Sequence, residues 1–108
     1  MPLTEYILMS AFTAIADSTR RQILALLRDG ELPFDALVEM LKLPQANVSK
    51  HLSALREAGL VRIRIDGPKR FYSLDHAPFA ELDAWLAPYR EFWALKFDAL
   101  GSHLDRSK

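Results

Sequence analysis

The chain has 108 residues, of which half are hydrophobic and 26% are charged, so we expect one folded domain rather than a disordered segment. It contains no cysteine, which excludes disulfides and thiol catalysis and is typical of a cytoplasmic protein. The chain opens without a basic secretory leader, and its apolar runs fall short of the ~20 residues that cross a bilayer. We therefore expect neither export nor membrane insertion.

The formal net charge is zero, but the charges are unevenly distributed along the chain. Residues 44–72 carry six basic and two acidic side chains, a net charge of +4, whereas residues 1–43 and 73–108 each have a net charge of −2. A positive block of this kind is either an ordinary solvated face or a surface that binds an anion such as nucleic acid. The elements that carry the block decide between these two interpretations.

The hydrophobic periodicity predicts four helices in the first part of the chain. The first spans about residues 4–14. The second follows an N-cap at Asp17 and closes at Gly30, which is suited to a helix C-terminus. The third spans about residues 33–41, and the fourth spans about residues 45–58. Two short helices joined by a three-residue turn are typical of a helix-turn-helix, here about residues 33–58.

The fourth helix has a distinct polar face. Its apolar residues Val48, Leu52 and Leu55 recur at helical spacing and place small, polar side chains on the opposite side. Small side chains let a helix enter the DNA major groove, and polar ones bind base edges or phosphates. The predicted DNA contacts are Gln45, Ala46, Asn47, Ser49, Lys50, His51 and Ser53. Capping and solubility are the alternative for the serines and asparagine, and a packing hydrogen bond is the alternative for His51, which borders the buried face.

From Leu60 the pattern changes to the alternation of a β-strand, and residues 60–74 are predicted to form a hairpin with its turn at residues 66–69. A hairpin directly after a helix-turn-helix is called a wing. The wing residues predicted to reach phosphates or the neighbouring minor groove are Arg64, Lys69 and Arg70. A solvated hairpin is the alternative. The predicted fold class is therefore mainly α with a β-hairpin wing, a winged helix-turn-helix.

An aromatic-rich helical pattern occupies about residues 78–104, with a kink or break expected near Ala87 because Pro88 follows. At ~1.5 Å per residue this helix is ~39 Å long, which exceeds the width of a domain of this size. We therefore predict that its aromatic stripe joins two copies as a homodimer as well as contributing to the core. The stripe consists of Trp85, Tyr89, Phe92, Trp93 and Phe97. A small-ligand pocket lined by these rings is the alternative.

Two stretches carry a family resemblance, FTAIADSTRRQILALLRDGEL at residues 12–32 and LPQANVSKHLSALREAGLV at residues 43–61. They resemble the opening helices and the recognition helix of the ArsR/SmtB family of bacterial winged-helix repressors. The wing IRIDGPKRFYSL and the ending LDAWLAPYREFWALKFDAL are similar, more specifically, to its SdpR-type autorepressor branch. The resemblance covers nearly the whole chain and implies a homodimeric repressor of a palindromic double-stranded DNA operator.

The chain departs from this family pattern at several positions. The thiolate sensor of the family needs two cysteines at the start of the third helix, where this chain has Pro33 and Asp35. The other metal site of the family needs imidazoles on the terminal helix, but His76 and His103 stand alone. A closed metal site needs about four ligands, so we expect no metal and no other cofactor. Lys42 replaces the usual turn glycine, and a left-handed lysine costs ~1–2 kcal/mol.

The sequence leaves three function classes to compare. A sequence-specific, dimeric DNA-binding regulator is the prediction, most simply a repressor that an unidentified effector or anti-repressor protein relieves. A winged-helix module that binds another protein through the aromatic stripe and ignores DNA is the second class. An enzyme is the weakest, because the histidines lie far apart and the chain has no glycine-rich phosphate loop and no nucleophile with an evident base partner. We therefore predict no catalytic residues.

Overall fold

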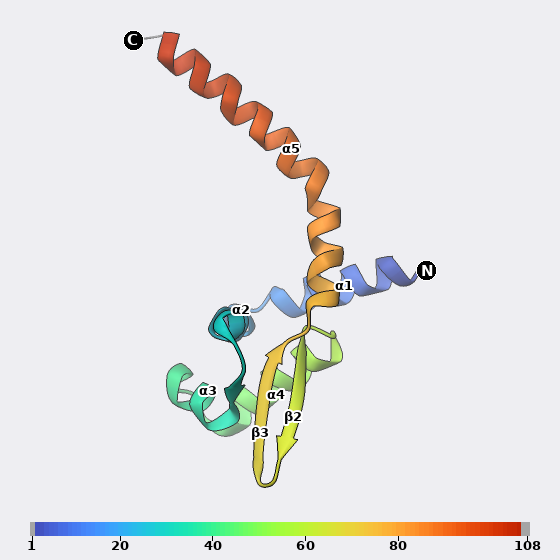
Figure 1. Ribbon diagram of the computed structural model, residues 1–108, viewed down its shortest axis with the longest axis vertical. Helices are drawn as coiled ribbons and strands as arrows, with labels where there is room; N and C mark the ends of the chain where they lie inside the picture. The colour runs from blue at the N-terminus through green and yellow to red at the C-terminus, as the bar shows by residue number, and fades with distance from the viewer. Residues whose placement is uncertain (1, 107–108) are drawn as a thin grey trace.

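The computed structural model describes residues 2–106, with side chains described through Gly101. Its elements follow the order α1 (Leu3–Ile15), α2 (Ser18–Leu26), the short 3-10 helix η1 (Leu27–Asp29), β1 (Leu32–Pro33), α3 (Phe34–Leu41), α4 (Gln45–Glu57), β2 (Val61–Asp66), β3 (Lys69–Leu74) and α5 (His76–Arg106). Figure 1 shows α2, α3 and α4 beside the hairpin of β2 and β3, while α5 extends away from them. The predicted fold class is confirmed.

The core lies where α2, α3 and α4 meet the sheet. The α4 side chains Val48, Leu52 and Leu55 are at most 1% exposed, so the helical spacing predicted their burial correctly. The buried residues of the other elements are Leu8, Ala11, Ala14, Ile23, Leu24, Leu27, Leu37, Leu60, Val61, Tyr72 and Leu82. This packing fixes which face of α4 points away from the protein.

The sheet has three antiparallel strands in the order β1, β3, β2. The wing hairpin pairs Val61 with Leu74 and Asp66 with Lys69, as the alternation predicted. The additional strand β1 pairs Leu32 with Tyr72 at the outer edge of β3. The strand β1 was not predicted from the sequence, because two residues are too short to show alternation. Its second residue is a proline, which sheets tolerate at edges. This short strand ties the wing to the start of α3.

Lys42 adopts a left-handed backbone, which favours glycine, with φ 56° and ψ 41°. Its N–H donates to the carbonyl of Val38 at 2.9 Å, so the turn after α3 keeps its hydrogen bond. The turn therefore absorbs the strain of a left-handed lysine.

Changing Lys42→Gly is expected to raise the free energy of unfolding by about 1 kcal/mol, because glycine adopts this backbone without a Cβ clash. The gain is measurable by urea unfolding. The matched control is Lys42→Ala, which removes the same charge but keeps the Cβ atom, and it should bring no such gain. An equal gain in both variants would assign the effect to the charge instead of the backbone.

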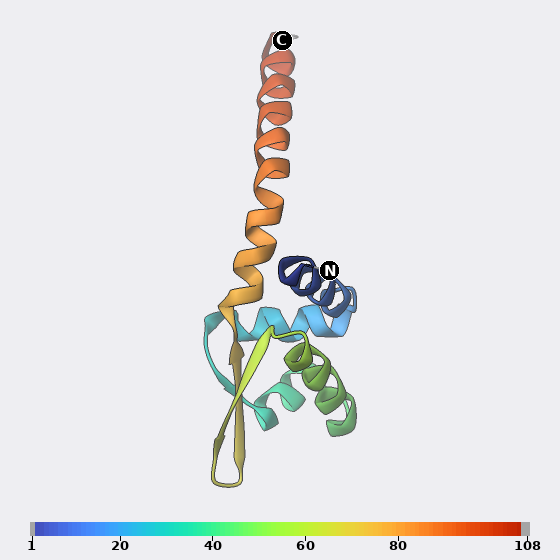
Figure 2. The same ribbon diagram turned by 90° about the vertical axis from the view of Figure 1, so that its right-hand side faces the viewer.

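Helix α5 continues through Pro88 without interruption. Figure 1 shows its axis bending partway along, and Pro88 accounts for a bend because its ring lacks an N–H and clashes with the preceding turn. Of the two expected outcomes, the helix is kinked and not broken. Figure 2 shows most of α5 standing clear of the other elements. The Cα radius of gyration is accordingly 18.2 Å, whereas a compact chain of this length has about 13 Å.

Candidate nucleic-acid interface

Helix α4 and the tip of the wing lie at the end of the molecule opposite the free end of α5 (Figures 1 and 2). Because α4 buries one face, its opposite face meets solvent. The predicted contact residues exposed on it are Gln45, Ala46, Asn47, Lys50 and Ser53. The predicted Ser49 and His51 are half-buried at its borders. The structure therefore presents the predicted polar face as one side of one helix.

The start of α4 has the features of an anion site. Pro44 occupies the N-cap position, and no side chain in the described part of the molecule caps the helix. The N–H groups of Asn47 and Val48 bond to the Pro44 carbonyl at 3.0 and 3.2 Å, whereas the N–H groups of Gln45 and Ala46 have no acceptor among the described residues. Free amides at a helix N-terminus attract phosphate, since they carry the positive end of the helix dipole.

The tip of the wing adds positive charge next to this helix start. Lys69 and Arg70 are exposed, and neither forms an ion pair with a residue that the structure describes. The Arg70 guanidinium lies 5.2 Å from the ring centroid of Phe34, so a cation–π contact steadies it over the start of α3. One groove of about 210 Å³ is lined by Asp35 and Gln45 together with the wing-tip residues Pro68, Lys69 and Arg70. The wing and α4 therefore form one continuous surface.

Arg64, the third predicted wing cation, is placed differently. Its guanidinium donates to both carboxylate oxygens of Glu31, with distances of 2.6 Å from Nη2 to Oε1 and 3.1 Å from Nε to Oε2, and it stacks 4.4 Å from the Phe71 ring centroid. The hydrogen bond with Arg64 lowers the pKa of Glu31, and the same bond raises the pKa of Arg64. Arg64 is thus held within the chain, whereas Lys69 and Arg70 are open to a ligand.

Changing Glu31→Gln is expected to flatten the acid side of the stability curve. The pKa of Glu31 lies below its ordinary value of 4.5, so its stabilising contribution is complete above that value and is lost as the pH falls through the folded-state pKa. The difference in unfolding free energy between wild type and variant should therefore shrink from about pH 6 to about pH 3 in urea titrations. Arg64→Gln, which breaks the same pair from the other side, should behave alike. A difference that stays constant with pH would contradict this role of the pair.

The aromatic stripe of α5 is half or more exposed along most of its length, with Trp93 at 55% and Phe97 at 66% exposure. Near the start of α5, Trp85 packs edge-on against Phe12 of α1, with the ring centroids 5.3 Å apart. Helix α1 extends the apolar area with Leu3, Tyr6 and Met9, all more than half exposed. We call the exposed apolar side chains of α1 and α5 the aromatic surface. The part of this surface on α1 was not predicted from the sequence, although Leu3, Tyr6 and Met9 recur at a spacing of three residues.

Within the described part of the chain, no three His, Cys, Asp or Glu side chains come together as metal ligands would. Among the same residues, no helix has both the length and the apolar run that a membrane span requires.

A two-helix motif that leaves a small polar face on its second helix, followed by a hairpin with an open cationic tip, defines a winged helix-turn-helix domain. Residues 17–62 match the family described as bacterial regulatory protein, arsR family. The chain is 30% identical over 77 residues to the transcriptional repressor SdpR of Bacillus subtilis, which covers 71% of this chain and 86% of SdpR. The chain therefore belongs to the arsR family of bacterial regulatory proteins.

Two more relatives agree with this assignment. The transcriptional regulator KmtR of Mycobacterium tuberculosis is 40% identical over 76 residues, which is 70% of this chain and 58% of KmtR; the chain thus spans little more than half of that relative. The solved structure of HlyU from Vibrio cholerae superposes with a TM-score of 0.67 at 31% identity, covering 87% of this chain and 99% of HlyU. These relatives are named as transcriptional regulators and not as enzymes.

Proposed function

We propose that this chain is a DNA-binding transcriptional repressor that acts in the cytoplasm, as a homodimer, on a palindromic double-stranded operator. The observation that carries the proposal is the joint surface of α4 and the wing, where a small polar helix face adjoins the open cations Lys69 and Arg70. Polar side chains bind base edges, while cations and helix N-termini bind phosphates. The positive charge of residues 44–72 suits a polyanion for the same reason.

In the proposed complex, residues 1–108 act as one winged helix-turn-helix domain, and two copies pair through their aromatic surfaces. Each α4 then enters one of two successive major grooves, which lie ~34 Å apart along one face of the duplex. The proposed DNA contacts are Gln45, Ala46, Asn47, Ser49, Lys50, His51, Ser53, Arg64, Lys69 and Arg70. Among them, Arg64 can turn to a phosphate only by weakening its pair with Glu31, so we assign the main wing contacts to Lys69 and Arg70.

We further infer that the repressor works without a metal sensor or other cofactor, as the resemblance to the SdpR-type autorepressor branch implies. The support is that the sequence holds no cysteine and that Pro33 and Asp35 stand at the start of α3. Added zinc is then expected to leave operator affinity unchanged. The inducing signal is an effector or an anti-repressor protein. It binds more tightly to the state of this protein that cannot bind DNA than to the state that binds DNA.

The direction of regulation needs its own measurement, since relatives of both kinds exist. SdpR is named a repressor, whereas HlyU of Vibrio cholerae is named an activator. Two further relatives, the arsenical resistance operon repressor of Staphylococcus aureus and the probable mercury resistance operon repressor of Streptomyces lividans, are also named repressors, which favours repression. A reporter gene placed behind the bound operator should be expressed less when the protein is present.

The experiment that tests the proposed function is selection of bound duplexes from a random pool, followed by gel shifts and by footprinting upstream of the protein's own gene. We expect an enriched palindrome whose half-sites are about one helical turn apart. Winged-helix modules that bind only other proteins retain no duplex, even at low salt. That result would overturn the proposal and assign the aromatic surface to a protein partner.

A further inference from the structure

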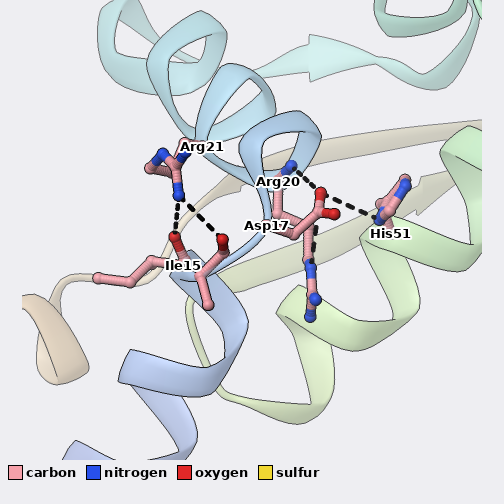
Figure 3. A network of polar contacts seen from close by, with 6 residues as sticks. Ile15, Asp17, Arg20, Arg21 and His51 are labelled. Carbon is pink, nitrogen blue, oxygen red and sulfur yellow. Dashed lines mark hydrogen bonds and ion pairs between the residues drawn. The ribbon is translucent and has the colours of Figure 1, made fainter.

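A polar network joins three helices at the corner between α1 and α2 (Figure 3). The Asp17 carboxylate caps α2 by accepting from the backbone N–H of Arg20, at 2.9 Å from Oδ2. The same oxygen lies 3.7 Å from Nδ1 of His51 on α4 and 3.9 Å from Nε of Arg20. One carboxylate oxygen therefore contacts both the start of α2 and the side of α4.

Arg21 forms hydrogen bonds on the other side of this corner, at the end of α1. Its Nη1 atom donates to the carbonyl oxygens of Ile15 and Ala16, at 2.8 and 3.1 Å, and so satisfies the exposed end of α1 (Figure 3). Because Asp17 follows this end directly, its carboxylate has a fixed position relative to both α1 and α2. A contact from Asp17 to α4 therefore positions α4 relative to the joined ends of α1 and α2.

His51 is well placed to transmit such a contact to DNA. It is half-buried at the edge of the apolar face that Val48 and Leu52 bury. The apolar packing sets which face of α4 points away from the protein, and a polar contact at the edge of that face adds a directional restraint that the non-directional hydrophobic effect does not supply. His51 is next to Lys50 and one helical turn after Asn47, so restraining His51 sets the direction in which both of these exposed side chains point.

We propose that Asp17 is a positioning residue for DNA recognition, which holds the rotation of α4 through His51 in addition to capping α2. The inference rests on the proposed function, since it concerns how α4 is presented to an operator. The hydrogen bond from the Arg20 backbone, followed by the charges of His51 and Arg20, lowers the pKa of Asp17. The carboxylate is therefore ionised at neutral pH, when the contact is needed.

The test separates the charge of Asp17 from its capping role. Asp17→Asn and Asp17→Ser both keep a good N-cap but lose the charge that faces His51. Each is expected to weaken operator binding about two- to fivefold, the range of a partly exposed ion pair, with little change in melting temperature. His51→Gln should weaken binding at least as much, because His51 is also a proposed DNA contact, and adding Asp17→Asn to His51→Gln should weaken binding no further. Asp29→Asn, which removes an exposed carboxylate outside the network, is the control and should bind like wild type.

A second measurement needs no DNA. In the free protein, the backbone amide resonances of Asn47 and Lys50 should move in the same direction in Asp17→Asn and His51→Gln but not in Asp29→Asn. Wild-type affinity in Asp17→Asn, fully additive losses in the double variant, or unmoved α4 resonances would each overturn the inference. Failure of the wild type to bind any duplex would instead overturn the proposed function, and the amide resonances would still decide whether Asp17 positions α4.

Discussion

Replacing Trp93 with glutamate is expected to convert the proposed homodimer into monomers and to weaken operator binding at least a hundredfold. Trp93 is 55% exposed on a helix that its own chain leaves largely uncovered. Burying that exposed area stabilises a dimer by about 2–3 kcal/mol per protomer. Twofold symmetry makes the loss occur twice, and a buried, unpaired carboxylate adds a desolvation cost. A hundredfold change needs only ~2.8 kcal/mol.

Sedimentation equilibrium and gel shifts of the same samples measure this prediction. Trp93→Phe keeps the apolar character and should stay dimeric. Gln22→Glu, which adds the same charge on the exposed side of α2, should also stay dimeric and bind like wild type. A dimeric Trp93→Glu variant would show that the aromatic surface is not the interface. A monomeric variant with undiminished affinity would show that operator binding does not need two copies.

The elements that the sequence predicted well are those whose residues face one core. In α4, the positions of Val48, Leu52 and Leu55 determine both the helix and its exposed face. Residues that recur with a 3.6-residue period lie on one side of a helix, so the opposite side is exposed. The strand β1 was missed for the opposite reason. Its pairing of Leu32 with Tyr72 is a contact across forty residues of sequence, and a two-residue segment carries no period that could indicate it.

The residue types of the candidate site could be predicted from the sequence, but the residues with which they pair could not. The charge pattern singled out Arg64, Lys69 and Arg70 alike, yet Arg64 meets Glu31 because β1 brings that carboxylate next to the wing. Likewise, His51 was expected to border the buried face, but its neighbour Asp17 lies on another helix. A sequence shows which side chains carry charge, whereas the fold decides which charges neutralise one another and which stay open to a ligand.

The open and paired cations should therefore differ when they are removed from the DNA complex. Arg70→Ala is expected to weaken binding by a similar factor on all sequences and to reduce the slope of log affinity against log salt by about one phosphate contact. Arg64→Ala should reduce that slope less, since its charge is already compensated by Glu31. Arg28→Ala removes a positive charge outside the block of residues 44–72 and serves as the matched control.

Lys50→Ala is expected to act on specificity and not only on charge. Lys50 is exposed on the polar face of α4, and loss of a base contact costs about 1–3 kcal/mol, or roughly five- to 150-fold, on the preferred operator. Binding to random duplex should fall much less, so the ratio of the two affinities should drop. Fluorescence anisotropy at several salt concentrations, with the selected operator and a scrambled duplex of equal length, measures both quantities. If Lys50→Ala and Arg70→Ala retain wild-type affinity and wild-type salt slopes, DNA does not bind at α4 and the wing.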